Sequence, residues 1–276
     1  MPLTTLISTA DVAAHATGDW AFVDCRFRLE DTAWGEREFL TAHLPRAVYA
    51  HLDRDLSGPR TGTNGRHPLP EVSRAIETFG RLGIGSGTQV VAYDQDTGMF
   101  ASRLWWMLRW LGHDEVAVLD GGFARWLAEG RPTESGPSHA STRTFTGAPR
   151  QDMLAELQDV ATGTSRLVDA RAPERFRGEV EPIDRVPGHI PGAINHFFLG
   201  NLRADGTMRS PEDLRVLWEG TLEGHEAGEV IAYCGSGVTA CQNLLALEHA
   251  GLSGARLYPG SWSEWSSDPE RPVEKA

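Results

Sequence analysis

The sequence predicts an α/β protein of two similar domains, each a parallel sheet flanked by helices. Two observations support this fold class. Short apolar segments that suit buried strands alternate with longer segments that suit helices, which is typical of parallel sheets covered on both faces. Several short motifs also occur twice in the same order, which indicates an internal duplication. A chain of 276 residues is long enough for two domains that each bury a core.

The duplication is visible in four pairs of motifs, each pair separated by about 140 residues. The pairs are Phe22–Arg26 with Leu167–Arg171, His43–Ala47 with His189–Ala193, Val90–Asp94 with Val230–Cys234, and Asp120–Phe123 with Pro259–Trp262. Between the copies, residues 130–150 are rich in Pro, Gly, Ser and Thr, a composition that suits an exposed connector. The expected domains are therefore residues 1–145 and 149–276.

The elements follow from hydrophobic pattern and from helix start and stop signals. In the first half, the apolar runs that predict strands are Trp20–Asp24, Val48–Tyr49, Gln89–Tyr93 and Val116–Leu119. The predicted helices there are Glu71–Leu82, which lies between Pro70 and Gly83, and Gly98–Leu111. In the second half, the predicted strands are Leu167–Asp169, Val230–Tyr233 and Arg256–Tyr258. The predicted helices are Asp152–Ala161, Pro211–Glu219 and Val238–Ala250.

Composition excludes several classes of function. A net charge of −12 argues against nucleic acid or an anionic membrane as the main partner. No segment approaches the roughly 18 apolar residues of a membrane span, and residues 1–23 contain no Lys or Arg, so no signal or transit peptide is expected. Three scattered cysteines give no disulfide framework, and the histidines show no ligand-like spacing, so no metal site is expected. We expect a cytoplasmic protein with reduced thiols.

One cysteine stands at a position suited to chemistry. Cys234 follows the apolar run 229–233 directly and precedes a predicted helix, so it lies at the strand-to-helix turn of a parallel α/β unit. Backbone N–H groups and the positive end of the helix dipole converge there and favour the reactive thiolate. We interpret Cys234 as a nucleophile. The first copy has Asp94 at the corresponding position, which predicts an inactive copy.

Together these motifs resemble the tandem rhodanese-domain sulfurtransferases over nearly the whole chain. The matching segments are Cys234–Thr239, Asp169–Arg171, Arg175–Gly178, His189–Ala193 and Gly260–Trp265. The loop is most similar to the 3-mercaptopyruvate type. The thiosulfate type usually carries basic residues directly after the cysteine, where this chain has Gly235 and Ser236.

The resemblance implies roles for particular residues. Cys234 would accept sulfur as a persulfide. Ser236 would take part in proton transfer together with His67 and Asp53. Asp55 is an equally good alternative to Asp53.

Substrate binding is implied for Arg175 and for a second arginine, either Arg185 or Arg177. Further binding is implied for the remaining residues of the loop, which are Gly235, Gly237, Val238 and Thr239.

The implied activity is transfer of a sulfane sulfur from 3-mercaptopyruvate to a thiol acceptor, such as thioredoxin or a low-molecular-weight thiol, or to cyanide. No cofactor is implied, because sulfur itself is the carried group. Two alternatives stay open, which are thiosulfate as the main donor and a non-catalytic sulfur-carrier or interaction module. Phosphatase chemistry on this scaffold needs an arginine six residues after the cysteine, where this chain has Ala240.

Overall fold

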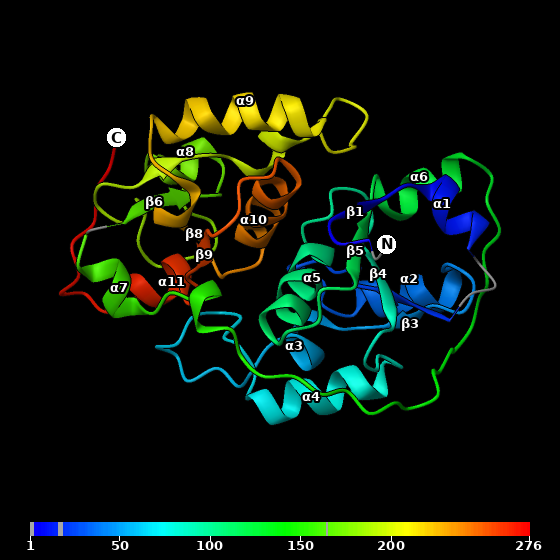
Figure 1. The fold of residues 1–276 in the computed structure, drawn as a ribbon. Helices are drawn as coiled ribbons and strands as arrows, with labels where there is room; N and C mark the ends of the chain where they lie inside the picture. Colours follow the sequence, from blue (N-terminus) through cyan, green and yellow to red (C-terminus); the bar gives the residue numbers. More distant parts are fainter. Residues whose placement is uncertain (1–2, 16–18, 164) are drawn as a thin grey trace. The chain divides into compact units, whose positions relative to one another are not determined.

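The computed structural model describes residues 3–15, 19–163 and 165–276, which group into two compact units (Figure 1). The first unit comprises Met1–Ser57, Pro70–Pro149 and Ala204–Thr207, and the second comprises Gly58–Leu69, Arg150–Arg203 and Met208–Ala276. The segment Gly58–Leu69 belongs to the first half of the sequence but to the second unit, and the segment Ala204–Thr207 belongs to the second half of the sequence but to the first unit. The segment Gly58–Leu69 matters most, because it contains His67.

The first unit contains a parallel sheet with the strand order β1-β5-β4-β2-β3 (Figure 1). Its strands are β1 Leu6–Ile7, β2 Trp20–Asp24, β3 Val48–Tyr49, β4 Gln89–Tyr93 and β5 Val116–Leu119. The four predicted strands of this half are confirmed, whereas the short strand β1 was not predicted. Its helices are α1 Thr9–Ala14, α2 Trp34–Thr41, α3 Leu52–Asp55, α4 Val72–Arg81, α5 Ala101–Trp110 and α6 Gly122–Ala128.

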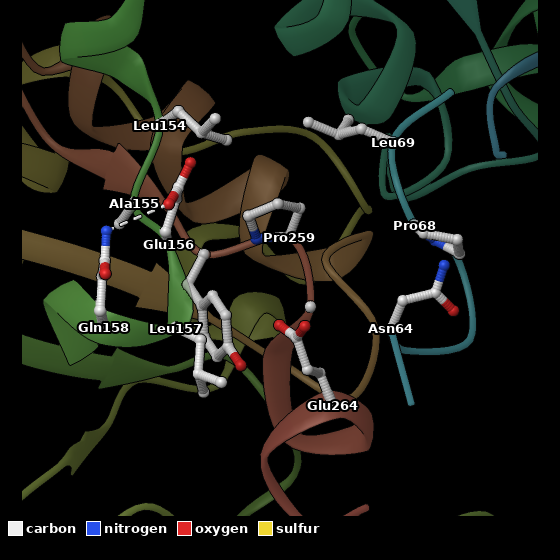
Figure 2. A pocket seen from close by; sticks show the side chains of 12 residues that line it. Asn64, Pro68, Leu69, Leu154, Ala155, Glu156, Leu157, Gln158, Pro259 and Glu264 are labelled. Atoms are coloured by element: carbon white, nitrogen blue, oxygen red, sulfur yellow. Dashed lines mark hydrogen bonds between the residues drawn. The ribbon is translucent and has the colours of Figure 1, made fainter. Parts of the chain in front are cut away.

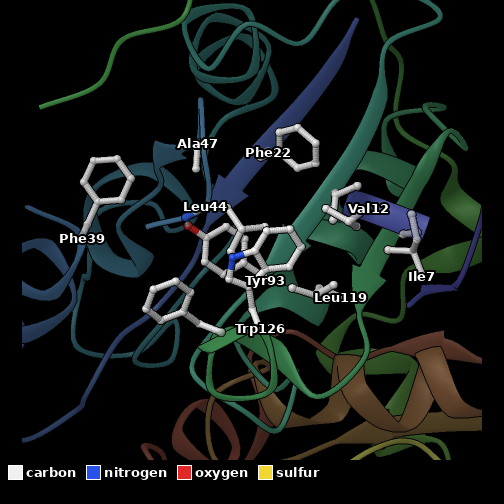
Figure 3. Packing of buried hydrophobic residues seen from close by; sticks show 12 residues of the cluster. Ile7, Val12, Phe22, Phe39, Leu44, Ala47, Tyr93, Leu119 and Trp126 are labelled. Atoms are coloured by element: carbon white, nitrogen blue, oxygen red, sulfur yellow. Dashed lines mark hydrogen bonds between the residues drawn. The ribbon is translucent and has the colours of Figure 1, made fainter. Parts of the chain in front are cut away.

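A hydrophobic cluster packs around Tyr93 in this unit (Figure 3). Tyr93 is fully buried, and its hydroxyl accepts a hydrogen bond from the backbone N–H of Leu44 at 3.2 Å, so its polar atom is satisfied inside the apolar cluster. The other members are Ile7, Val12, Phe22, Phe39, Leu44, Ala47, Val91, Ala117, Leu119, Phe123 and Trp126. Burying each large side chain contributes about 1.5–3 kcal/mol.

The second unit has a parallel sheet with the strand order β7-β6-β8-β9, so β8 lies in its interior. Its strands are β6 Arg166–Asp169, β7 Ile194–Asn195, β8 Val230–Tyr233 and β9 Arg256–Leu257. Its helices are η1 Gln151–Met153, α7 Leu157–Ala161, α8 Pro173–Phe176, η2 Phe198–Asn201, α9 Pro211–Leu222, η3 Ala227–Glu229, α10 Thr239–His249 and α11 Ser261–Trp265. Its core consists of Ala155, Val160, Leu167, Ile190, Ile231, Tyr233, Tyr258, Trp262 and Trp265.

The predicted helix Asp152–Ala161 is wrong as a single element. It is divided into η1 and α7, because Leu154 forms a parallel bridge with Leu257 and the backbone N–H of Ala155 donates to the Leu257 carbonyl at 2.8 Å. Pairing at the sheet edge thus replaces the hydrogen bonds that a continuous helix would make.

The two units repeat the same buried ion pair. Arg26 Nη2 lies 2.7 Å from Asp24 Oδ2, and Arg171 Nη2 lies 2.6 Å from Asp169 Oδ2, with all four side chains 1% exposed or less. Each Nη2 also donates to a backbone carbonyl, at 2.6 Å for Arg26 and 2.7 Å for Arg171. The repeated Asp-x-Arg motif therefore builds one and the same buried contact twice.

The histidines of the second repeated motif also match. His43 stacks on Phe39 and His189 stacks on Phe176, with ring centroids 4.0 and 3.7 Å apart. In both pairs the histidine Nδ1 lies 2.7 Å from the backbone carbonyl oxygen of the same phenylalanine. Within the described ranges, none of the helices is both long enough and apolar enough to cross a membrane.

Candidate active site

The nucleophile candidate Cys234 lies in the turn that joins β8 to α10. Its side chain is buried, and the backbone N–H of Ser236 points at its sulfur with N and Sγ 3.4 Å apart. The backbone N–H of Cys234 donates to Ser261 Oγ at 3.1 Å, which fixes the start of the turn. The sulfur therefore lies at the carboxyl end of an interior strand, beside the first turn of an 11-residue helix.

The turn requires glycine at position 237. Gly237 has a φ of 72°, and a methyl group placed on it would lie 2.5 Å from the carbonyl oxygen of Pro259. A side chain would therefore be strained by its backbone conformation and would overlap the neighbouring backbone. Val238 is buried at the end of the turn, and the half-buried Thr239 begins α10.

A histidine and a serine meet next to the cysteine. His67 Nδ1 lies 2.8 Å from Ser236 Oγ, and both side chains are buried. His67 comes from the segment Gly58–Leu69 of the second unit. Neighbouring residues hold this segment, because a methyl group on Gly65 would lie 2.8 Å from the carbonyl oxygen of Gly260. A proton can pass between an imidazole and a hydroxyl at this distance.

Two arginines lie beside Gly235, the residue after the cysteine. A methyl group placed on Gly235 would lie 2.7 Å from Arg66 Nη2 and 3.6 Å from Arg175 Nη2. The Arg175 guanidinium makes a bidentate contact with the Glu181 carboxylate, from Nε at 3.2 Å and from Nη2 at 2.7 Å. Its Nη2 also lies 3.2 Å from Asp184 Oδ2. Arg66 Nη1 contacts the other oxygen of Asp184. One carboxylate thus joins two guanidinium groups.

The two carboxylates respond differently to this environment. Burial raises the pKa of Asp184, and the attraction of Arg66 and Arg175 offsets only part of that effect. Burial also acts to raise the pKa of Glu181, but hydrogen bonds from Arg175 and from two backbone N–H groups outweigh burial and lower that pKa. Glu181 is therefore ionised at neutral pH and forms an ion pair with Arg175.

The other arginines expected to bind substrate are placed differently. Arg185 is exposed, and within the described part of the chain it has no hydrogen bond or ion pair. Arg177 pairs with Glu179 through two hydrogen bonds of 2.7 and 3.0 Å on the surface. Sequence reasoning missed Arg66, although it directly precedes His67. The only local signal was its place in the Gly/Pro-rich loop around that histidine.

The expected aspartate lies in the first unit. Asp53 is a half-buried residue of α3. The alternative Asp55 is occupied locally, since its Oδ2 accepts the backbone N–H of His51 at 2.8 Å and its Oδ1 pairs with Arg81 at 2.5 Å. Asp55 therefore binds the backbone of His51, the N-cap residue of α3.

The corresponding loop of the first unit holds a carboxylate instead of a thiol. Asp94 accepts hydrogen bonds from the backbone N–H groups of Asp96, Gly98, Phe100 and Ala101 at 2.8 to 3.3 Å. Complete burial nevertheless raises the pKa of Asp94 to about 6. The backbone N–H groups of this loop thus bind the carboxylate of Asp94 in the way that such turns bind a free anion.

The other two cysteines differ from Cys234. Cys241 is fully buried in α10 and its thiol donates to the Gly237 carbonyl at 3.3 Å. Cys25 is buried, and burial together with nearby carboxylates raises the pKa of its thiol well above the ordinary value. Both fit a structural role.

A cavity of about 450 Å³ is lined in part by Pro259 and does not include Cys234 in its lining (Figure 2). Figure 2 shows the carboxylate of Glu264 in the lining, with Asn64 and Leu69 across the opening. Glu156 also lines this cavity, so both of its charged side chains are acidic. Such a lining does not suit an anionic donor.

Comparison with known proteins places this geometry in context. A family model of the rhodanese-like domain matches the chain twice, at residues 8–129 and 151–268. The chain is 46% identical over 275 residues to a Pseudomonas aeruginosa protein named "Probable 3-mercaptopyruvate sulfurtransferase", with 97% of each chain covered. It is 35% identical over 256 residues to a thiosulfate sulfurtransferase of Bos taurus, covering 86% of this chain and 84% of that one.

Among solved structures, the 3-mercaptopyruvate sulfurtransferase from Leishmania major matches with a TM-score of 0.85 and 32% identity, covering 95% of this chain and 74% of that chain. Each range matched by the family model contains the central strands of one parallel sheet. The duplication inferred from the four motif pairs is therefore confirmed.

Proposed function

This chain belongs to the rhodanese family, and from that premise we propose that it transfers a sulfane sulfur from 3-mercaptopyruvate to a thiol acceptor or cyanide through a persulfide of Cys234. The observation that carries the proposal is the convergence of three groups on one loop. These are the Cys234 sulfur, the His67–Ser236 contact of 2.8 Å and the Arg175 guanidinium close to Gly235.

The proposed first step is attack of the Cys234 thiolate on the donor sulfur. A sulfur–sulfur bond forms and the carbon–sulfur bond of the donor breaks, with its electron pair leaving as the enolate of pyruvate. The proton of the donor thiol ends on the enolate carbon, so the products are the persulfide anion and pyruvate. Backbone N–H groups of the loop would stabilise the sulfur anion before and after the step.

That proton must be carried from sulfur to carbon, and we assign this task to Ser236 and His67. Their buried contact supports a relay in which the hydroxyl faces the donor and the imidazole receives and returns the proton. Asp53 remains the proposed third member, on the strength of its motif. Arg175 would contact the donor carboxylate through Nη1, because hydrogen bonds from a guanidinium to a carboxylate are charge-assisted and strong, while its Nε and Nη2 hold Glu181.

The loop residues have supporting roles in this proposal. Gly235 leaves room for the Arg66 guanidinium, and Gly237 leaves room for the Pro259 carbonyl group. Val238 and Thr239 lead the backbone into α10, whose N-terminal N–H groups would stabilise the bound sulfur anion.

Mass spectrometry tests the proposal. Incubation of the reduced protein with 3-mercaptopyruvate should add the mass of one sulfur to the peptide that contains Cys234, and Cys234→Ser should abolish the gain. Cys241→Ser serves as the control and should retain it. A protein that gains no sulfur would instead be an interaction module.

Thiosulfate is the rival donor, because the bovine relative carries that name and two arginines near Gly235 could also hold a sulfur oxyanion. Measuring kcat/KM for both donors under one set of conditions separates them. A higher value for thiosulfate would reverse the donor assignment.

For the acceptor we propose a small thiol or a reduced thioredoxin-like protein, and for the location a reducing compartment such as the cytoplasm. The support is that the three described cysteines are free thiols. Adding each acceptor to the isolated persulfide and following the loss of the extra sulfur ranks them directly.

A further inference from the structure

We propose that Arg66, and not an arginine of the segment after α8, is the second guanidinium that holds the donor carboxylate. This inference rests on the proposed function. Its first support is position. Arg66 Nη2 is the atom nearest to a methyl group built on Gly235, at 2.7 Å, whereas the nearest atoms of Arg175 lie at 3.6 and 3.7 Å. Two guanidinium groups therefore converge next to the nucleophile.

The second support is the hydrogen-bonding capacity of Arg66. Its Nη1 is occupied by Asp184. Its Nε is buried and, among the described residues, has no hydrogen-bond partner. Nε and Nη2 form one edge of a guanidinium, and this edge binds a carboxylate through two parallel hydrogen bonds. On Arg175 the equivalent edge is already used by Glu181. Arg66 thus offers the edge that Arg175 lacks.

The third support is that Arg66 is held in place from three sides. Its backbone N–H donates to Ser263 Oγ at 3.0 Å, the preceding Gly65 lies against the backbone of Gly260, and Asp184 links its guanidinium to that of Arg175. A side chain fixed in this way loses little rotamer freedom when it binds a ligand. Because His67 is the next residue, one short segment supplies both the proton relay and the carboxylate contact.

The absence of a side chain at Gly235 leaves room for the Arg66 guanidinium. A side chain at position 235 would overlap its Nη2, so Arg66 would have to shift away from the loop to admit one. In this chain the positive charge beside the loop comes from residue 66. Arg177 and Arg185 lie on the surface, in ordinary solvated positions.

The test measures binding separately from turnover. Arg66→Gln should raise KM for 3-mercaptopyruvate roughly 10- to 100-fold, the usual range for losing charge-assisted hydrogen bonds, while kcat changes little. The inhibition constant of pyruvate, which carries the same carboxylate, should rise in parallel. Arg209→Gln removes an exposed arginine of the same unit, whose Nε donates to the Gly200 carbonyl, and should behave as wild type.

Arg66→Lys keeps the charge without the two-pronged edge and should give an intermediate KM, so the test does not depend on one variant. A wild-type KM in both Arg66 variants would overturn the inference, as would a KM increase in Arg185→Gln in place of Arg66→Gln. The proposed function fails separately, if the wild-type protein forms no persulfide on Cys234 from this donor.

Discussion

Replacing Gly237 by alanine should destabilise the second unit strongly, because both its conformation and its surroundings demand glycine. A left-handed backbone costs a residue with a side chain about 1–2 kcal/mol. The added methyl would also lie 2.5 Å from the carbonyl oxygen of Pro259 and 2.9 Å from its Cα, and relieving such an overlap costs about 1–3 kcal/mol. We therefore expect a loss of about 2–5 kcal/mol of unfolding free energy.

Two other glycines provide matched comparisons. Gly220 lies on the exposed side of α9 with no atom within 4 Å of a built methyl group, so Gly220→Ala should stabilise the protein by about 0.5–1 kcal/mol. At Gly235 the methyl would meet only the ends of two flexible arginine side chains, so Gly235→Ala should keep its stability and instead raise KM.

Urea denaturation followed by tryptophan fluorescence measures all three changes, since Trp262 is fully buried in the second unit. Equal stability of Gly237→Ala and Gly220→Ala would refute the steric argument for the loop.

Three further outcomes are expected. Burial raises the pKa of Asp94 to about 6 in the folded protein, from about 3.8 in the unfolded chain. Below pH 3.8 this difference stabilises the folded state by about 3 kcal/mol, and the stabilisation is lost as the pH rises through 6. Asp94→Asn should flatten that part of the stability profile, and an unchanged profile would count against the raised pKa. Ser236→Ala and His67→Gln should each slow persulfide formation roughly 100- to 10,000-fold in single-turnover measurements. The double variant should be little slower than either single variant, because the two residues act in one relay. A double variant whose loss equals the product of the two single losses would show that they act independently. Asp169→Ala should cost about 3–5 kcal/mol because it leaves Arg171 buried without its main partner, and a smaller loss in calorimetry would mean that other acceptors compensate.

Much of the fold could be predicted because buried parallel strands are continuous apolar runs. The strands Gln89–Tyr93 and Val230–Tyr233 have the predicted bounds, and all their residues are buried. Most short elements escaped prediction, with the two-residue strand β3 as an exception. The two-residue strands β1 and β7 and the four-residue helix α8 are held by tertiary packing, and their sequences are too short to show a period.

The candidate site was only partly predictable. Cys234 and Ser236 lie in one loop, whose glycines already indicate a tight turn. Arg66 was missed because its contact with Asp184 joins residues 118 positions apart, and no local pattern records such a contact. The expected second arginines, Arg177 and Arg185, lie close to Arg175 in sequence, whereas the guanidinium nearest to Gly235 comes from the first half of the chain.

The path of the segment Gly58–Leu69 has a consequence for how the duplicated chain can evolve. Its residues precede the connector, whereas Cys234 follows it, so cutting the connector leaves the thiol on one fragment and His67 on the other. A truncation that discards the half with Asp94 would also discard the histidine. The half of the sequence that has Asp94 in place of a thiol is therefore needed to complete the His67–Ser236 contact.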